Sequence, residues 1–150
     1  MDRRSVIKAA GIFTAAATAF LAMPRWAFAA YSQKAFKQKA SIDALQNLYG
    51  SSATTVSDKI TLKAPDIAEN GAVVPLEVIT DLKADSIAIL IEKNPSPLAI
   101  KADIPSGTQG LLKTRCRMGK TTNVMAVVES GGKLYTASKE VKVTIGGCGG

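Results

Sequence analysis

The 150-residue sequence contains no histidine and only two cysteines. Without histidine, the chain cannot form Ser-His or Cys-His catalytic pairs, and it lacks the commonest metal ligand. Two cysteines are too few for a four-thiolate zinc site or a disulfide framework. Any chemistry must therefore come from a thiol, a carboxylate, a lysine or the backbone, and we expect no metal and no cofactor.

The first thirty residues have the pattern of an export signal. Arg3 and Arg4 precede a weakly apolar stretch at 9–23, and Ala27-Phe28-Ala29 is typical of a cleavage site. The paired arginines are typical of the twin-arginine route. The apolar stretch is shorter than the roughly 20 residues that a membrane-spanning helix needs. We therefore predict that residues 1–29 are a cleaved signal, that the mature chain is periplasmic and that it has no membrane anchor.

Loss of residues 1–29 changes the charge and the aromatic content. It removes four basic residues and one acidic residue, so the net charge falls from +7 to +4. The aromatics that stay are Tyr31, Phe36, Tyr49 and Tyr135. Because nucleic-acid readers combine a strong basic stripe with stacking rings, we expect no nucleic-acid partner.

The pattern of residues 30–145 predicts one domain, an N-terminal helix followed by a β-sandwich. Residues 32–49 have apolar side chains at helical spacing, and Gly50 follows as a C-cap. After a polar linker at 51–55 the period changes to two and β-branched residues dominate. Seven short strands separated by turns are typical of a sandwich. The predicted strands are Lys59–Lys63, Val73–Thr80, Ser86–Glu92, Leu111–Met118, Asn123–Glu129, Lys133–Ser138 and Glu140–Ile145.

Several residues predict how these strands are arranged. Asn70-Gly71 and Gly131-Gly132 are turn signals, because glycine adopts positive φ at no steric cost. Pro75 cannot donate to a ladder and marks its strand as an edge or a bulged strand. The 86–91 segment is apolar on both faces, which indicates a central strand or one covered by the helix or a partner.

The chain ends with a single thiol among glycines. Gly146, Gly147, Gly149 and Gly150 surround Cys148, so the thiol has no side chain beside it to pack against. Residues 146–150 are therefore predicted to be a mobile arm that projects Cys148 from the sandwich. At full extension, the three residues after Ile145 reach about 10 Å.

Three parts of the sequence resemble the SoxY family, the sulfur carrier subunits of the bacterial thiosulfate-oxidising Sox system. They are the terminal Val-Thr-Ile-Gly-Gly-Cys-Gly-Gly at 143–150, the segment Ala64–Pro75 and the Arg-Arg pair, and the likeness spans essentially the whole chain. The resemblance implies an immunoglobulin-like β-sandwich. It also implies a covalent carrier that holds sulfur intermediates on Cys148.

The resemblance further implies a set of partners. A SoxZ-like subunit would form a heterodimer with the chain. A SoxXA-like c-type cytochrome would join thiosulfate to Cys148 as an S-thiosulfonate, a SoxB-like hydrolase would release sulfate, and a sulfane dehydrogenase would oxidise the persulfide-type sulfur that stays. The chain itself would catalyse none of these steps, so it is expected not to be an enzyme.

Two other functions are compatible with the ending. A terminal Gly-Gly also occurs in ubiquitin-like carriers, in which the last carboxylate becomes a thiocarboxylate, but that route needs a cytoplasmic activating enzyme and the predicted export argues against it. The chain could instead be an exported β-sandwich binding module with an incidental cysteine tail. Prenylation is excluded because only two residues follow Cys148.

Cys116 lies on a predicted strand. Alternation places it with Leu112, Thr114 and Met118 on the inward face, where a free cysteine behaves as a small apolar residue. The alternative is a disulfide with Cys148, which would silence the arm. The outward row of Lys113, Arg115 and Arg117, with Lys120 nearby, is either a solvated face or a docking surface for acidic partners.

Overall fold

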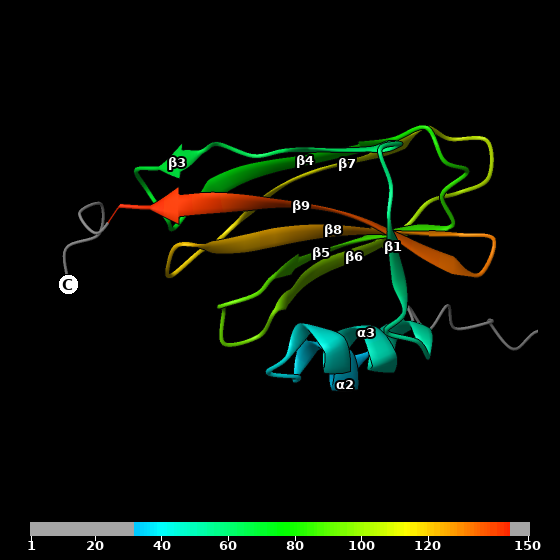
Figure 1. Cartoon of the computed structure of the whole chain (residues 1–150), viewed down its shortest axis with the longest axis horizontal. Coiled ribbons are helices and arrows are strands. Elements are labelled where there is room, and N and C mark those ends of the chain that lie inside the picture. Colours follow the sequence, from blue (N-terminus) through cyan, green and yellow to red (C-terminus); the bar gives the residue numbers. More distant parts are fainter. Residues whose placement is uncertain (1–31, 145–150) are drawn as a thin grey trace, which may run out of the picture. The chain divides into compact units, whose positions relative to one another are not determined.

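The computed structural model describes residues 32–144. Within this range, two β-sheets pack face to face and two helices cover the outer face of the larger sheet (Figure 1). The predicted all-β sandwich with helical structure at its N-terminal side is confirmed. The predicted signal at 1–29 and arm at 146–150 lie outside the described residues.

The predicted single helix at 32–49 is wrong, because the segment forms two helices. These are α2 (Gln33–Phe36) and α3 (Ser41–Tyr49). Ala40 adopts an extended conformation, with φ −119° and ψ 141°, and the Ser96 hydroxyl donates to the Phe36 carbonyl that a continuous helix would use itself. The break lets both helices pack on the same sheet. Gly50 ends α3 at φ 71°, as predicted for a C-cap.

The two sheets contain nine strands among the described residues. The larger sheet has the order β1 (Thr54–Val56), β9 (Lys133–Val143), β8 (Thr122–Ser130), β5 (Ser86–Ile91) and β6 (Leu98–Asp103), and β3 (Ile67–Ala68) pairs with β9 away from this path. The smaller sheet has the order β2 (Ile60–Lys63), β4 (Val74–Thr80) and β7 (Gly110–Cys116). Both β1 and β3 run parallel to β9, whereas the other pairs are antiparallel.

Three of the observed strands were not predicted, and the two strands predicted last in the sequence form a single strand, β9. The strands β1 and β3 have three and two residues, and each exists because β9 offers it a free edge. The third, β6, follows the proline bend at 94–97 and pairs with β5. The predicted break in the last strand, between Ser138 and Glu140, is absent because β8 pairs continuously across it.

The doubly apolar segment 86–91 is a central strand and is also covered by helices, so the prediction is confirmed. All six residues of β5 are buried. Ile87, Ile89 and Ile91 face the core between the sheets, whereas Ala88 and Leu90 face α2 and α3. A strand between two apolar layers needs apolar residues at every position.

The end of α3 is joined to the larger sheet by a short chain of hydrogen bonds. The Ser86 hydroxyl donates to Glu129 Oε2 at 2.9 Å and lies 3.1 Å from the Tyr49 hydroxyl. The Ser86 hydroxyl has a single proton, which it donates to Glu129, so in the second hydrogen bond the Tyr49 hydroxyl is the donor and Ser86 Oγ the acceptor. Burial, opposed by the hydrogen bond to Ser86, raises the pKa of Tyr49 from 10.0 to about 12.

This raised pKa predicts a loss of stability in alkali. The folded state holds the Tyr49 proton more tightly than the unfolded chain does, so the contribution is complete below pH 10 and is lost as the pH rises towards 12. We expect the free energy of unfolding to fall by about 2 kcal/mol more in the wild type than in Tyr49→Phe over this interval. Urea unfolding at pH 8, 10 and 11.5 measures it. Parallel pH profiles of the two proteins would contradict the prediction.

Two turns have different reasons for their glycines. Gly131 and Gly132 have φ of 57° and 75° and form the predicted hairpin between β8 and β9. Gly71 does not have positive φ, so the reason given for it from the sequence is wrong. An ideal Cβ at Gly71 would overlap the Met118 carbonyl oxygen and lie 2.8 Å from Val143 Cγ1. The position therefore needs glycine for close approach.

Pro75 lies in a middle strand, which differs from the predicted edge or bulge. The neighbour β2 ends at Lys63, opposite Glu77, so on this side β4 is an edge from Leu76 towards its start, and this part includes Pro75. No described strand lies on that side to accept a hydrogen bond, so the missing N–H of Pro75 leaves no ladder hydrogen bond unmade. The tertiary pairing therefore makes one part of a central strand suitable for proline.

Candidate functional site at the end of strand β9

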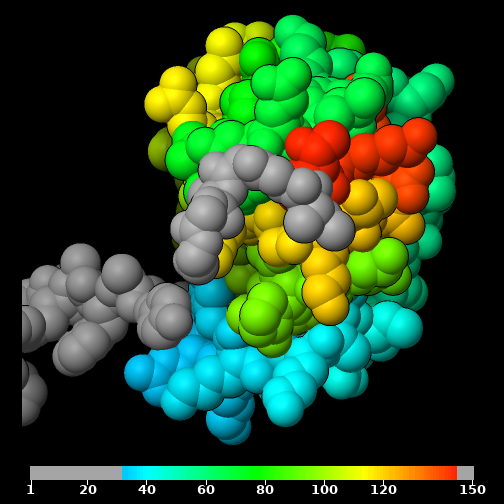
Figure 2. Space-filling view, turned by 90° about the vertical axis from the view of Figure 1, so that its left-hand side faces the viewer, coloured from blue at the N-terminus to red at the C-terminus, as the bar shows by residue number. Residues whose placement is uncertain are grey.

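The last strand carries the chain to one end of the sandwich and is held there on both sides. On one side, the Lys142 N–H donates to the Asp66 carbonyl at 2.9 Å, and the Thr144 N–H donates to the Ala68 carbonyl at 3.2 Å. On the other side, the Val143 N–H donates to Thr121 Oγ1 at 3.0 Å. Figure 2 shows this end of the molecule, with the helices along one side of it. The backbone is therefore fixed up to Thr144, the last described residue.

The loop between β7 and β8 supports the same end. The Met118 N–H donates to the Gly71 carbonyl at 2.7 Å, and the Met118 side chain is buried. We call the group Ala68, Gly71, Met118, Thr121 and Val143 the exit site, because the chain leaves the sandwich beside these residues. The exit site combines segments that lie far apart in the sequence, and each contributes a backbone or hydroxyl contact.

The turn between β5 and β6 braces the β7–β8 loop. Asn94 Nδ2 donates to the Arg117 carbonyl at 2.7 Å, and the Lys93 ammonium donates to the Thr121 carbonyl at 3.2 Å. Lys93, Arg117 and Lys120 are all exposed. The loop therefore keeps a defined backbone while its cationic side chains stay in solvent.

The predicted carrier residue lies outside the described residues. This holds for Cys148 and for the glycines predicted to give it mobility, Gly146, Gly147, Gly149 and Gly150. Covalent geometry still limits the reach of the thiol. Cys148 is four residues beyond Thr144, so its Cα lies at most about 14 Å from that of Thr144, and the side chain adds only its own short length. A protein that acts on Cys148 must therefore come close to the end of the sandwich at Thr144.

Cys116 points inward, as the alternation predicts, but it is only half-buried. It packs beside the inter-sheet core, and Arg115 and Arg117 on either side of it are exposed. Among the strands of residues 32–144, none lies beside the outer edge of β7, which explains the incomplete burial. Burial raises the pKa of the Cys116 thiol, and a hydrogen bond with Thr114 opposes the effect. Cys116 is a free thiol, and a raised pKa lowers its thiolate fraction and its reactivity.

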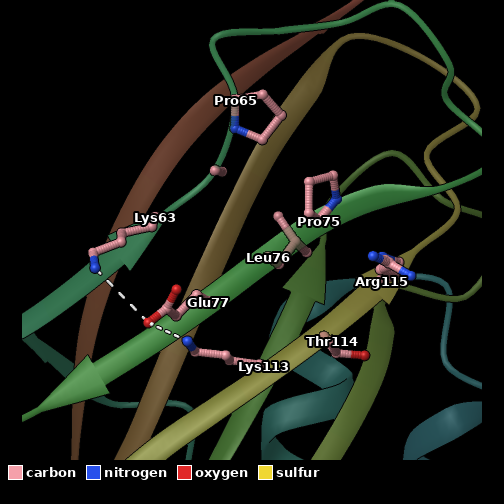
Figure 3. Close-up of a pocket in the computed structure, with 9 residues that line it drawn as sticks. Lys63, Pro65, Pro75, Leu76, Glu77, Lys113, Thr114 and Arg115 are labelled. Atoms are coloured by element: carbon pink, nitrogen blue, oxygen red, sulfur yellow. Dashed lines mark ion pairs between the residues drawn. The ribbon is translucent and has the colours of Figure 1, made fainter.

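The predicted basic row divides between two places. Lys113 and Arg115 lie on the outer face of the smaller sheet, whereas Arg117 and Lys120 lie in the β7–β8 loop. Lys63 shares this face with Lys113 and Arg115, which the sequence pattern did not indicate. Lys63 Nζ and Lys113 Nζ lie 3.8 Å and 3.3 Å from Glu77 Oε1 (Figure 3). These side chains line an open groove of about 750 Å³ whose walls include Pro65 and Pro75.

Within residues 32–144, no group of three or more histidine, cysteine, aspartate or glutamate side chains could hold a metal ion. No helix in the same range is long and apolar enough to cross a bilayer.

The chain matches the family model described as "Sulfur oxidation protein SoxY" over residues 45–148. It is also similar to a solved structure, the sulfur carrier protein SoxY from Chlorobium limicola f thiosulfatophilum. The two are 44% identical, the TM-score is 0.63, and the match covers 69% of this chain and 94% of the other. No curated protein matches the chain.

A second solved structure shares the fold alone. It is a superoxide reductase (neelaredoxin) from Ignicoccus hospitalis, with 14% identity and a TM-score of 0.52 over 57% of this chain and 80% of the other. At this level of identity the similarity concerns the sandwich and carries no function.

Proposed function

The chain belongs to the SoxY family, the sulfur carriers of sulfur oxidation, and from this premise we propose that it carries the intermediates of thiosulfate oxidation covalently on Cys148. The observation that carries the proposal is the extent of the family match. The matched residues run to Cys148 itself, within the Gly-Gly-Cys-Gly-Gly ending. The match therefore covers the reactive residue as well as the sandwich.

The geometry of the exit site supports a carrier. Hydrogen bonds from two sides hold β9 up to Thr144, so the sandwich is a rigid base for the residues that follow. Four glycines in the last five residues remove side chains that would obstruct entry into a narrow site. The chemistry then takes place in the active sites of other proteins, and this chain presents its cargo to them.

Loading of the carrier is an oxidation. The Cys148 thiol and thiosulfate form a sulfur–sulfur bond, the thiol proton is released, and two electrons pass to a c-type cytochrome similar to SoxXA. The product is a cysteine S-thiosulfonate. An unassisted thiol has a pKa of about 8.5, so only a few per cent is thiolate at neutral pH. We therefore place the activation of Cys148 inside the partner's site.

Unloading begins with hydrolysis. Water attacks the terminal sulfonate sulfur in a SoxB-like hydrolase, the sulfur–sulfur bond to that group breaks, and sulfate and a proton leave. A persulfide stays on Cys148, and a sulfane dehydrogenase oxidises it. In this proposal the chain is not an enzyme, forms a heterodimer with a SoxZ-like subunit, and works in the periplasm after export by the twin-arginine route.

The intact mass of the mature protein tests the proposal. The protein is incubated with thiosulfate and its oxidising cytochrome, and the mass is measured before and after reduction. We expect one adduct, equal to thiosulfuric acid less two hydrogens, that is confined to Cys148 and removed by a reductant. The variant Cys116→Ser is the matched control and should acquire the same adduct.

Two results would overturn the proposal. A mass change at the terminal carboxylate of Gly150 would assign the chain to the thiocarboxylate type of carrier. The second result is an unmodified Cys148 in an experiment in which the same cytochrome loads an independently validated carrier. It would indicate that the chain is a binding module with an incidental thiol.

A further inference from the structure

The two sheets differ in what covers their outer faces. Helices α2 and α3 bury the outer face of the larger sheet, with Ala35, Ala44 and Leu45 packed against it. No described element covers the outer face of the smaller sheet (Figure 1). We call this uncovered surface the outer face. It comprises Lys63, Pro75, Glu77, Ile79, Leu111, Lys113 and Arg115, which share one side of β2, β4 and β7.

The outer face is basic and partly apolar. Glu77 is the acidic residue of this set, and it lies between Lys63 and Lys113 (Figure 3). Arg115 is exposed and has no ion pair among residues 32–144. Leu111 is 38% exposed, and Pro75 is exposed as well. Three cations against one carboxylate leave an excess of positive charge, which favours an acidic surface opposite it.

The outer face adjoins the exit site. Pro75 lies opposite Arg115 in the ladder, and Val74 lies opposite Cys116. Two residues beyond Cys116, the Met118 N–H bonds to the Gly71 carbonyl, and Gly71 approaches Val143. Gly71 is four residues from Pro75, at most about 14 Å along the chain. A protein seated on this end of the outer face is therefore beside the point where the chain leaves towards Cys148.

The size of the outer face indicates a transient partner. The strands β4 and β7 are about 23 Å long and β2 is about 13 Å long, and at a spacing of about 4.8 Å they present roughly 280 Å² before the flanking loops are added. A complex on this face would bury less than about 1,200 Å², which is typical of weak redox encounters, and permanent interfaces are larger and more apolar.

We propose that the outer face is the docking surface for an acidic redox protein, the one that takes up the two electrons released when Cys148 is loaded. The inference rests on the proposed function. Docking there raises the encounter rate through charge attraction, and the short reach from Thr144 then delivers Cys148 to the redox site. Such attraction is screened by salt.

The test removes the positive charge and follows loading. The variant carries Lys63→Gln, Lys113→Gln and Arg115→Gln. The matched control carries Lys39→Gln, Lys83→Gln and Lys133→Gln, which removes the same charge from exposed lysines outside the smaller sheet. Loading by the purified c-type cytochrome is measured as cytochrome reduction with thiosulfate, in the presence of the SoxZ-like subunit. At low ionic strength we expect kcat/KM to fall at least tenfold in the variant and less than twofold in the control.

Salt dependence and thermal unfolding complete the experiment. The variant should lose most of the dependence of kcat/KM on ionic strength, while its thermal unfolding stays close to that of the control. If the wild type is loaded and the two variants behave alike, docking is overturned and the carrier function stands. If the variant loses its SoxZ-like subunit, the face belongs to the permanent interface and the proposal is wrong. If wild-type Cys148 is never loaded, the proposed function fails, and docking fails with it.

Discussion

Replacement of Cys148 by serine is expected to reduce thiosulfate-dependent electron transfer to the level measured without the carrier. A serine hydroxyl cannot form a sulfur–sulfur bond with thiosulfate, so no intermediate can be held. The measurement is cytochrome reduction in a mixture of all partners. The change affects a residue beyond the described range and should leave the thermal unfolding of the sandwich unaltered.

Cys116→Ser is the matched control for this prediction. Cys116 is half-buried beside the inter-sheet core, so its replacement should cost about 1 kcal/mol of stability and leave electron transfer within about twofold of the wild type. A total loss of transfer in Cys116→Ser would contradict the assignment of the carrier to Cys148. Peptide mapping without reductant also tests the disulfide alternative, which requires a 116–148 crosslink.

Among the described glycines that lack positive φ, Gly71 is expected to cause the largest loss of stability when it is replaced by alanine. A Cβ at this position overlaps the Met118 carbonyl oxygen and lies 2.8 Å from Val143 Cγ1. A backbone carbonyl cannot move away as a flexible side chain can, so we expect a cost of about 3 kcal/mol and a fall in the melting temperature of about 10 °C. Calorimetry measures both.

Gly119→Ala provides the comparison within the same end of the sandwich. A Cβ at Gly119 meets no atom within 4 Å, so the change should alter stability by no more than about 0.5 kcal/mol. Equal costs for the two alanine variants would contradict the close-approach argument. The pair separates steric overlap at the exit site from the general effect of replacing a loop glycine.

The strands that were predicted well have a signal in their own side chains. Alternation or continuous apolarity identified β4, β5, β7 and β8 within a few residues of their observed bounds. The short strands β1 and β3 have no such signal, because two or three residues become a strand only when β9 supplies the partner. The break between α2 and α3 was missed for a similar reason. It depends on Ser96, sixty residues away, which bonds the Phe36 carbonyl.

In the candidate site, too, some features have a signal in the sequence and others do not. Cys148 stands out in the sequence alone, because it follows a patterned strand and its neighbours are four glycines, which offer no side chain to pack against. The residues of the exit site have no comparable signal in the sequence. Gly71 suggested a turn, yet its contacts with Met118 and Val143 arise from three separate segments. Lys63 joins the outer face only because β2 pairs with β4.

The sequence by itself determined the family and the sandwich class and singled out Cys148 as the thiol that we propose as the carrier, because all three depend on local pattern: side-chain alternation, glycine content and a cysteine among glycines. Only the tertiary structure decided how β9 is held up to Thr144, why Gly71 must be glycine and which face stays uncovered beside the exit site. These features depend on the register between strands, and the pairing of segments distant in sequence sets that register.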